Sequence, residues 1–193
     1  MPQDLAPILA IGASSGGPKA LAEILSHLPK DLGAAVLVVQ HADPEGSRDL
    51  IAWLAGLSAL PVAAAKAGEA PRPGRVLVAK GGDHLFLSAG YTLEYTADPK
   101  DTPYRPSVDV LFASLAKNSP KLGAAVLLTG MGRDGAKGLL ALRRVGWTTI
   151  AQDQATSEIY GMPKAAAQLH AAELVLPVSA MAAFLATLMS SHV

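Results

Sequence analysis

Short apolar runs alternate along the chain with amphipathic stretches. The runs are nearly continuous in Val, Ile, Leu and Ala, as strands buried on both faces of a parallel sheet require. The expected strands are Pro7–Gly12, Ala34–Gln40, Arg75–Ala79, Gly123–Thr129, Thr148–Ala151 and Glu173–Leu176, with Pro61–Ala65 as a weaker candidate.

Helical spacing of apolar residues fills most of the stretches between these runs. The expected helices are Pro18–Leu28, one capped by Ser47, one capped by Ser107, Gly135–Val145 and Ser179–Met189. Strands that alternate with helices imply right-handed crossovers. We therefore predict a doubly wound α/β domain with a mostly parallel sheet, helices on both faces and a Rossmann-like arrangement of three layers. His84–Leu87 and Tyr91–Tyr95 break the rhythm and predict an antiparallel hairpin at one edge.

Composition narrows the classes of function. The chain has 193 residues, half of them hydrophobic, which suits one domain with a substantial core. Its 16 basic and 16 acidic residues balance and form no basic stripe, which argues against nucleic acid as a partner. The absence of cysteine excludes thiolate nucleophiles and zinc–thiolate sites. Without a membrane-spanning apolar run or a signal segment, we expect a cytoplasmic monomer with no membrane insertion.

Glycines and serines fill the turn after the first strand. The spacing Gly12-x-Ser14-x-Gly16 fits a nucleophile elbow, a tight strand–turn–helix that exposes the serine hydroxyl. The helix that follows would point its free amides at a developing anion. A plain Gly/Ser turn that caps a helix is the alternative, and spacing alone leaves it open.

His41 directly follows the second strand. Because sequential strands usually lie adjacent, its imidazole is expected within reach of Ser14, where it would act as a general base. A purely structural role is the alternative for a lone histidine. His170 is a rival base that would restore the chain order of the α/β hydrolases, but it ends a helix. His84, at the start of the hairpin, would approach the site from the side.

Three glycines surround one acid in the loop after the Gly123–Thr129 run. Asp134 in this loop would orient the histidine and stabilise the imidazolium, as the third member of a triad does. The amides near Met131 would supply an oxyanion donor. Asp134 would alternatively, or in addition, cap the next helix.

The Gly/Ser turn also resembles that of short-chain dehydrogenases, and Tyr160-x-x-x-Lys164 mimics their Tyr/Lys pair. That pair needs a single helical face, whereas Gly161 and Pro163 intervene here. Pro18 replaces the last glycine of the dinucleotide turn, and no acid follows the second strand to bind a ribose hydroxyl. The sequence therefore disfavours a nicotinamide cofactor.

Six sequence blocks carry a more specific resemblance. From about Ile8 to Leu188 the chain resembles the catalytic domain of chemotaxis protein-glutamate methylesterases, the CheB family. The blocks are IGASSGG (Ile11–Gly17), VQH (Val39–His41), RPSVDVLF (Arg105–Phe112), LLTGMGRDGAKGL (Leu127–Leu139), IAQD (Ile150–Asp153) and YGMP (Tyr160–Pro163).

The resemblance implies a role for each matching position. Ser14 matches the nucleophile, His41 the general base and Asp134 the orienting acid. Met131 matches the position whose backbone amide lies at the oxyanion site, and Ser15 matches a second hydroxyl beside the nucleophile. The implied reaction releases methanol from γ-glutamyl methyl esters on the helical signalling region of methyl-accepting chemotaxis receptors. Some members also deamidate glutamine there, and the resemblance implies no cofactor and no metal.

The chain departs from the family pattern in two respects. Members commonly carry an N-terminal receiver domain, whereas we expect residues 1–193 to form a single methylesterase catalytic domain with no receiver domain. Thr102-Pro103-Tyr104 stands where polar His or Arg residues often precede the Arg-Pro-Ser-Val-Asp block. This loop is a candidate for contact with the receptor, so two alternatives stay open. They are a hydrolase of small esters with the same triad and a receptor-binding adaptor without turnover.

Overall fold

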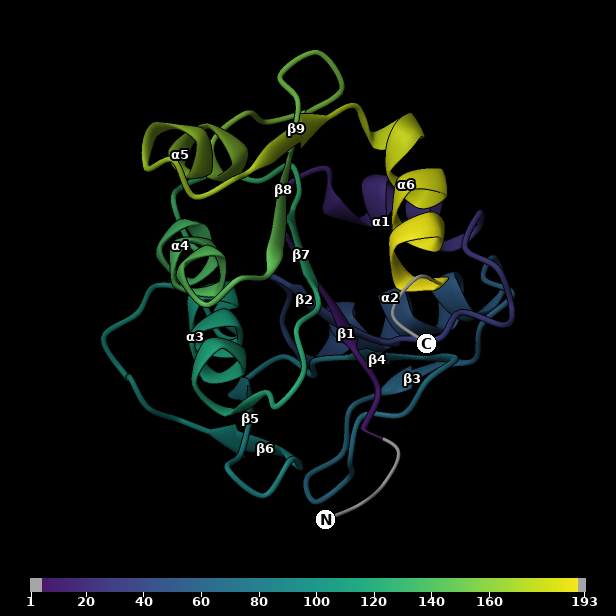
Figure 1. Cartoon of the computed structure of the whole chain (residues 1–193). Helices are drawn as coiled ribbons and strands as arrows, with labels where there is room; N and C mark the ends of the chain where they lie inside the picture. Colours follow the sequence, from purple (N-terminus) through teal and green to yellow (C-terminus); the bar gives the residue numbers. More distant parts are fainter. Residues whose placement is uncertain (1–4, 191–193) are drawn as a thin grey trace.

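A seven-stranded sheet lies between two layers of helices in the computed structural model, which describes residues 5–190 (Figure 1). The strand order is β3-β4-β2-β1-β7-β8-β9, and every pair of neighbours is parallel. The strands are β1 (Ile8–Ala13), β2 (Ala35–Gln40), β3 (Val62–Ala64), β4 (Arg75–Val78), β7 (Ala124–Leu127), β8 (Thr148–Gln152) and β9 (Leu174–Leu176). Each expected strand is confirmed.

Three helices cover each face of this sheet (Figure 1). One layer consists of α1 (Gly17–Leu25), α2 (Pro44–Ala55) and α6 (Val178–Ser190), and the other of α3 (Val108–Asn118), α4 (Ala136–Arg144) and α5 (Met162–Gln168). The predicted doubly wound architecture is confirmed. The expected hairpin forms as β5 (His84–Leu87) and β6 (Leu93–Thr96), which pair in a separate antiparallel sheet against α3.

Alternate residues of the central strand serve the two halves of the core. Leu9 and Ile11 of β1 pack under α1, α2 and α6, whereas Ile8 and Ala10 pack under α3, α4 and α5. All four side chains are fully buried. A strand covered on both faces has no polar alternation, which explains the continuous apolar runs in the sequence.

The prediction that Ser47 caps a helix is wrong. Helix α2 begins at Pro44, and its N-cap is Asp43, whose Oδ1 accepts a hydrogen bond of 2.7 Å from the Gly46 amide. Proline suits the first turn because its missing amide needs no partner there. Ser47 lies inside the helix and accepts a hydrogen bond of 3.0 Å from the Gly81 amide instead.

Helix α5 is not among the helices expected from the sequence, in which Gly161 and Pro163 argued only against Tyr160 and Lys164 sharing one helical face. In the structure Gly161 is the N-cap and Pro163 lies in the first turn, where a proline is tolerated. Both residues therefore mark the start of a helix.

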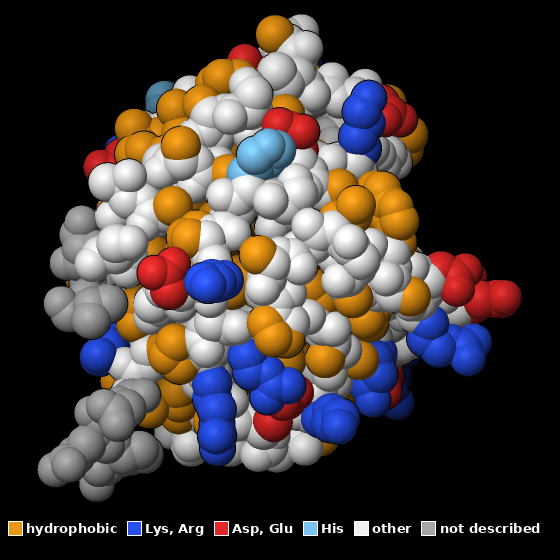
Figure 2. All heavy atoms as spheres, turned by 90° about the vertical axis from the view of Figure 1, so that its right-hand side faces the viewer, with side chains coloured by type: hydrophobic (Ala, Val, Ile, Leu, Met, Phe, Trp, Pro, Cys, Tyr) orange, Lys and Arg blue, Asp and Glu red, His pale blue; other side chains and the backbone are white. Residues whose placement is uncertain are grey.

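The surface of the described residues carries neither a membrane-spanning helix nor, on the face in Figure 2, a purely basic patch. Between residues 5 and 190 no helix is both long and apolar enough to cross a bilayer. Figure 2 views the molecule from the side of α6, where basic side chains gather low on the face with acidic ones among them. Apolar side chains on this face are interspersed with polar ones.

Candidate active site

The carboxyl ends of three neighbouring strands bring the candidate residues together. Strand β1 lies between β2 and β7 in the sheet, and the loops that follow these strands carry Ser14, His41 and Asp134. Ala13 pairs with Gln40 in the register, so Ser14 and His41 each directly follow one of these paired residues. This is the edge at which open α/β sheets place their ligands.

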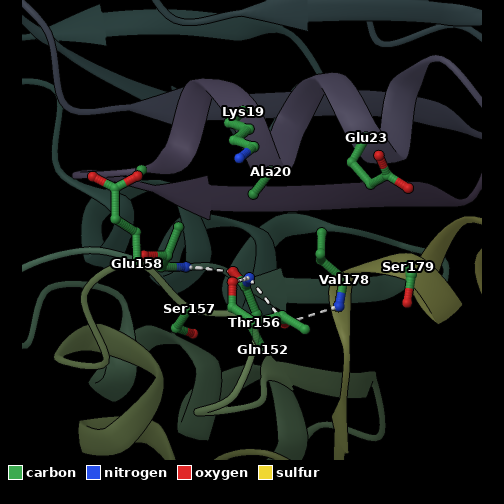
Figure 3. A pocket seen from close by; sticks show the side chains of 11 residues that line it. Lys19, Ala20, Glu23, Gln152, Thr156, Ser157, Glu158, Val178 and Ser179 are labelled. Atoms are coloured by element: carbon green, nitrogen blue, oxygen red, sulfur yellow. Dashed lines mark hydrogen bonds between the residues drawn. The ribbon is translucent and has the colours of Figure 1, made fainter.

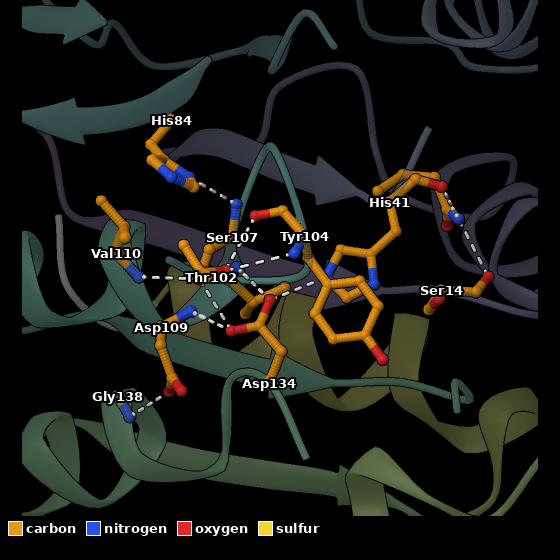
Figure 4. A network of polar contacts seen from close by, with 12 residues as sticks. Ser14, His41, His84, Thr102, Tyr104, Ser107, Asp109, Val110, Asp134 and Gly138 are labelled. Carbon is orange, nitrogen blue, oxygen red and sulfur yellow. Dashed lines mark hydrogen bonds and ion pairs between the residues drawn. The ribbon is translucent and has the colours of Figure 1, made fainter. Parts of the chain in front are cut away.

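A hydrogen bond joins two of the three candidates. His41 Nε2 lies 2.7 Å from Asp134 Oδ2, and the two side chains are only 9% and 7% exposed (Figure 4). The other ring nitrogen of His41, Nδ1, is buried and has no hydrogen-bond partner within residues 5–190. It lies on the side of the ring that faces Ser14 (Figure 4).

Asp134 does not cap the helix that follows it, contrary to one of the two roles expected for it. Gly135 occupies the N-cap of α4 in a left-handed conformation, with no side-chain hydrogen bond to the helix. The Asp134 carboxylate instead receives the start of α3. It accepts hydrogen bonds of 2.8 Å from Ser107 Oγ, 2.7 Å from the Val108 amide and 3.0 Å from the Asp109 amide.

These donors determine the charge on Asp134. Burial by itself would raise the pKa of this carboxyl, but hydrogen bonds from His41, Asp109, Val108 and Ser107 outweigh it and lower the pKa below its ordinary value. The group is therefore a charged acceptor at neutral pH, which is the form that orients an imidazole and stabilises its protonated state.

The backbone of Ser14 is fixed by three hydrogen bonds. Its amide donates to the Thr129 carbonyl at 3.0 Å, and its carbonyl accepts from the Gly17 amide at 2.8 Å and from Gln40 Nε2 at 2.9 Å. The Ser14 hydroxyl itself has no hydrogen bond to any residue between 5 and 190. The structure thus joins His41 to Asp134 by a hydrogen bond, and at the same edge of the sheet the Ser14 hydroxyl has no partner within the described part of the chain.

The loop after β7 must approach Ser14 closely. A Cβ placed on Gly130 would lie 2.7 Å from the Ser14 Cβ and 2.3 Å from the Met162 sulfur, so a glycine is required here. The next residue, Met131, exposes 62% of its surface, and its amide makes no backbone hydrogen bond among the described residues. Ser15 is exposed in the facing turn. Both stay predictions as oxyanion-binding positions.

The two rival histidines have other surroundings. His170 is exposed in the connection from α5 into β9. This connection lies at the amino ends of the parallel strands, whereas Ser14 and His41 follow the carboxyl ends. His84 is fully buried, and its Nε2 donates to the Pro99 carbonyl at 3.1 Å while its Nδ1 accepts from the Ser107 amide at 3.0 Å. His84 therefore reaches the site only through Ser107.

Sequence reasoning missed two neighbours of the histidine–aspartate pair. The ring of Tyr104 stacks on the imidazole of His41, with centroids 4.1 Å apart and planes 5° from parallel (Figure 4). Ser107 was expected only as a helix cap, a role it has, since its Oγ accepts from the Val110 amide at 3.4 Å. The RPSVDVLF block was the one signal that pointed to Ser107, and no spacing pointed to Tyr104.

A second carboxyl ties the start of α3 to α4. Asp109 Oδ1 accepts a hydrogen bond of 2.6 Å from the Gly138 amide. Burial raises the pKa of Asp109, the negative charge of Asp134 adds to the rise, and the Gly138 hydrogen bond partly opposes it. Asp109 thus holds two helices together beside the site without touching His41.

Open cavities surround the pair. One of about 420 Å³ is lined by His41, Ala42, Asp43, Thr102, Pro103, Tyr104 and Arg105. A larger one of about 700 Å³ lies on the Asp134 side, with Arg133 and Lys137 among its lining residues. A third of about 350 Å³ is lined by Lys19, Ala20 and Glu23 of α1 and by residues of the β8–α6 region that include Gln152, Thr156 and Glu158 (Figure 3). The His41 imidazole and the Asp134 carboxylate therefore each border open space that a substrate side chain can enter.

Comparisons with known proteins identify the family of the chain. The family model described as CheB methylesterase matches residues 9–185. A protein-glutamate methylesterase/protein-glutamine glutaminase of Burkholderia orbicola is 54% identical over 182 residues, which cover 94% of this chain and 54% of that protein. A relative of the same name from Cupriavidus metallidurans is 53% identical over 182 residues, with the same coverage. The chain thus spans about half the length of these curated relatives.

A solved structure matches over nearly the whole fold. The crystal structure of the Thermotoga maritima CheB methylesterase catalytic domain superimposes with a TM-score of 0.91 at 36% sequence identity. The match covers 95% of this chain and 98% of that one. The similarity therefore extends over nearly all of the three-layer domain.

Proposed function

Because this chain belongs to the CheB methylesterase family, we propose that it is a serine hydrolase acting on γ-methyl esters of glutamyl side chains in chemoreceptors. The names of its relatives combine a protein-glutamate methylesterase with a protein-glutamine glutaminase, and the proposal includes both reactions. The nucleophile is Ser14, the general base His41 and the orienting acid Asp134.

One observation carries the proposal. His41 is hydrogen-bonded at Nε2 to a charged, buried Asp134, and its buried Nδ1, on the side toward Ser14, has no hydrogen-bond partner among residues 5–190. An imidazole held at one nitrogen by a carboxylate is a base at the other. A histidine with a purely structural role would have both nitrogens bonded, as His84 has.

In the first step the Ser14 oxygen attacks the ester carbonyl carbon while His41 Nδ1 takes the hydroxyl proton. The carbonyl electron pair moves onto its oxygen, and we expect the backbone amide of Met131 to donate to that oxyanion, with Ser15 as a second oxyanion- or substrate-binding position. One such donor typically contributes about 2.7–4 kcal/mol to the transition state. Asp134 stabilises the imidazolium that forms.

In the second step the tetrahedral intermediate collapses and the carbon–methoxy bond breaks. His41 gives its proton to the methoxy oxygen, and methanol leaves. A water molecule, deprotonated by His41, then attacks the acyl-enzyme and releases a glutamate side chain with Ser14 restored. With a glutamine substrate the same steps release ammonia.

The proposal also names a partner and a setting. The partner is the helical signalling region of a methyl-accepting receptor, as the sequence resemblance implies. We expect the setting to be the cytoplasm and the chain to act as a monomer.

Methanol release from methylated receptor fragments tests the activity. We expect the purified chain to release labelled methanol and Ser14→Ala to lose roughly 10⁴-fold in turnover. Ser26→Ala is the matched control, because Ser26 is an exposed serine at the far end of α1. Turnover that survives in Ser14→Ala would remove this serine from the mechanism.

Two comparisons separate the alternatives. His41→Gln should abolish turnover and His170→Gln should leave it unchanged, and the reverse result would transfer the role of base to His170. Cleavage of a small chromogenic ester without release from receptor fragments would favour the small-ester hydrolase. Tight binding of receptor fragments without turnover of either substrate would favour the adaptor.

A further inference from the structure

We propose that Tyr104 is a positioning residue, whose ring fixes the plane of the His41 imidazole and couples it to the loop that carries Met131. The inference rests on the proposed function, since it assigns His41 the role of base. It concerns a residue at which this chain departs from the pattern of the family it resembles.

The contact between the two rings is extensive. Their centroids lie 4.1 Å apart and their planes differ by 5°, so the phenol covers one face of the imidazole. With the stack in place, the His41 side chain is only 9% exposed. Aromatic pairs of this kind favour a fixed relative orientation beyond the area that they bury.

The stack supplies a restraint that the Asp134 hydrogen bond lacks. The hydrogen bond fixes Nε2 at 2.7 Å from the carboxylate, but a single bond leaves the ring free to swing about that atom. Nδ1 has no partner within residues 5–190 to oppose such a swing. The flat face of Tyr104 limits the swing, and Nδ1 stays directed toward Ser14 (Figure 4).

The hydroxyl end of the Tyr104 side chain reaches the loop that carries Met131. A Cβ placed on Gly132 would lie 2.6 Å from the Tyr104 hydroxyl oxygen, so the phenol packs directly against this glycine. Gly132 follows Met131, whose amide is the proposed oxyanion donor. One side chain therefore touches both the base and the loop that holds the developing negative charge.

The loop beneath the ring is anchored. Thr102 Oγ1 accepts from the Tyr104 amide at 3.2 Å and donates to the Tyr104 carbonyl at 3.0 Å. Buried His84 forms hydrogen bonds to both ends of the segment 99–107, at the Pro99 carbonyl and the Ser107 amide. Such anchoring is what a positioning role requires, because a ring on a loose loop would transmit no restraint.

The test separates positioning from receptor recognition by using a small covalent probe. A fluorophosphonate reacts with an activated serine and needs no receptor surface, so its rate reports the Ser14–His41 pair and the oxyanion site without receptor binding. We expect Tyr104→Ala to react roughly 10- to 100-fold more slowly, the size of effect that a small misplacement causes. Tyr104→Phe keeps the ring and should react within about threefold of wild type.

Two further measurements keep the test decisive if the alanine variant folds poorly. Tyr104→Leu fills similar space without a flat ring and should react as slowly as the alanine variant. In both variants the NMR signals of the His41 ring protons should move downfield, because the shielding face above them is gone, while Tyr104→Phe keeps the wild-type shifts. Wild-type probe rates in folded Tyr104→Ala or Tyr104→Leu would overturn the inference.

The same experiment distinguishes failure of the inference from failure of the proposed function. A wild-type chain that reacts with the probe but releases no methanol from receptor fragments would contradict the function and leave the role of Tyr104 intact. Demethylation of receptor fragments, together with a probe rate that does not change in the Tyr104 variants, would support the function and contradict the role of Tyr104. A higher KM for receptor fragments with an unchanged kcat and probe rate would show that Tyr104 only contacts substrate, which also overturns the inference.

Discussion

The hydroxyl of Ser107 donates a hydrogen bond of 2.8 Å to Oδ1 of Asp134, the carboxylate oxygen that does not contact His41. The same hydroxyl accepts from the Val110 amide and caps α3. A helix start is thus fixed to the acid of the candidate triad by one side chain. The cap and the orientation of the acid cannot be altered independently.

Replacing Ser107 should therefore affect stability and turnover together. We expect Ser107→Ala to lower the free energy of unfolding by about 0.5–2 kcal/mol, as lost N-caps do. Turnover should fall, because one donor to the carboxylate is gone. Ser107→Thr keeps the hydroxyl and should recover most of both quantities. Denaturant unfolding and methanol release measure them, and an alanine variant changed in neither would contradict the coupling.

Asp134→Asn tests the acid directly. The amide cannot stabilise an imidazolium, and its NH2 group meets N–H donors at the start of α3, so we expect a loss of turnover of roughly 10⁴-fold and a lower melting temperature. Asp49→Asn is the control, because Asp49 is exposed on α2. A turnover close to wild type in Asp134→Asn would leave His41 without its proposed orienting partner.

The lowered pKa of Asp134 makes its contribution to stability depend on pH. The unfolded carboxyl titrates near pH 4, and the folded group titrates lower. A depressed pKa stabilises the fold in full above the unfolded value, and this part is lost as pH falls through the folded value. The melting-temperature difference between wild type and Asp134→Asn should thus be constant from about pH 5 to 7 and shrink below about pH 4. A difference that stays constant down to about pH 2 would contradict this assignment.

Much of this fold is determined by patterns that the sequence displays. The strands were found because a sheet covered on both faces needs uninterrupted apolar runs, and β1 illustrates this with six buried residues in succession. Ser14, His41 and Asp134 were selected as candidates because parallel strands put their following loops at one edge. The hydrogen bond between His41 and Asp134 follows from that rule and from the order of β1, β2 and β7.

What the sequence could not supply depends on the course of irregular loops. Tyr104 meets His41 across 63 positions through a loop without periodicity, and no spacing rule predicts such a contact. Aspartate and serine both cap helices well, so residue type alone does not choose between Asp43 and Ser47 for the N-cap of α2. Asp43 is the cap because α2 begins at Pro44. Asp134 was expected to cap α4, the helix that follows it, whereas its carboxylate accepts hydrogen bonds from the Val108 and Asp109 amides at the start of α3.

The contribution of Asp109 to stability should depend on pH in the opposite sense to that of Asp134. The raised pKa of Asp109 means that the folded state disfavours the charged carboxyl. At a pH above the raised pKa, the charge on Asp109 therefore lowers the stability of the fold. This penalty disappears as the pH falls toward about 4, where the carboxyl of the unfolded chain is also protonated. Asp109→Asn keeps an oxygen that can accept from the Gly138 amide. We expect this variant to melt at a higher temperature than wild type at pH 7, with the difference vanishing in acid. A lower melting temperature at pH 7 would show that the charge stabilises the fold.

Gly132 and Gly68 offer a matched pair for testing the contact with Tyr104. Both have left-handed backbone, with φ of 89° and 84°, so alanine carries a similar conformational cost of about 1–2 kcal/mol at either position. A Cβ on Gly68 would meet open space, whereas one on Gly132 would meet the Tyr104 hydroxyl. We expect Gly68→Ala to lower the melting temperature with normal turnover, and Gly132→Ala to lower both.

The double variant Gly132→Ala/Tyr104→Phe isolates the cause. Removing the phenol oxygen relieves the steric clash but not the backbone strain, so the double variant should recover part of the turnover that Gly132→Ala loses. Because the two residues are in contact, their effects should be non-additive. Strictly additive effects on turnover would mean that Gly132 acts through its backbone alone, and that the Tyr104 hydroxyl does not transmit its displacement to the site.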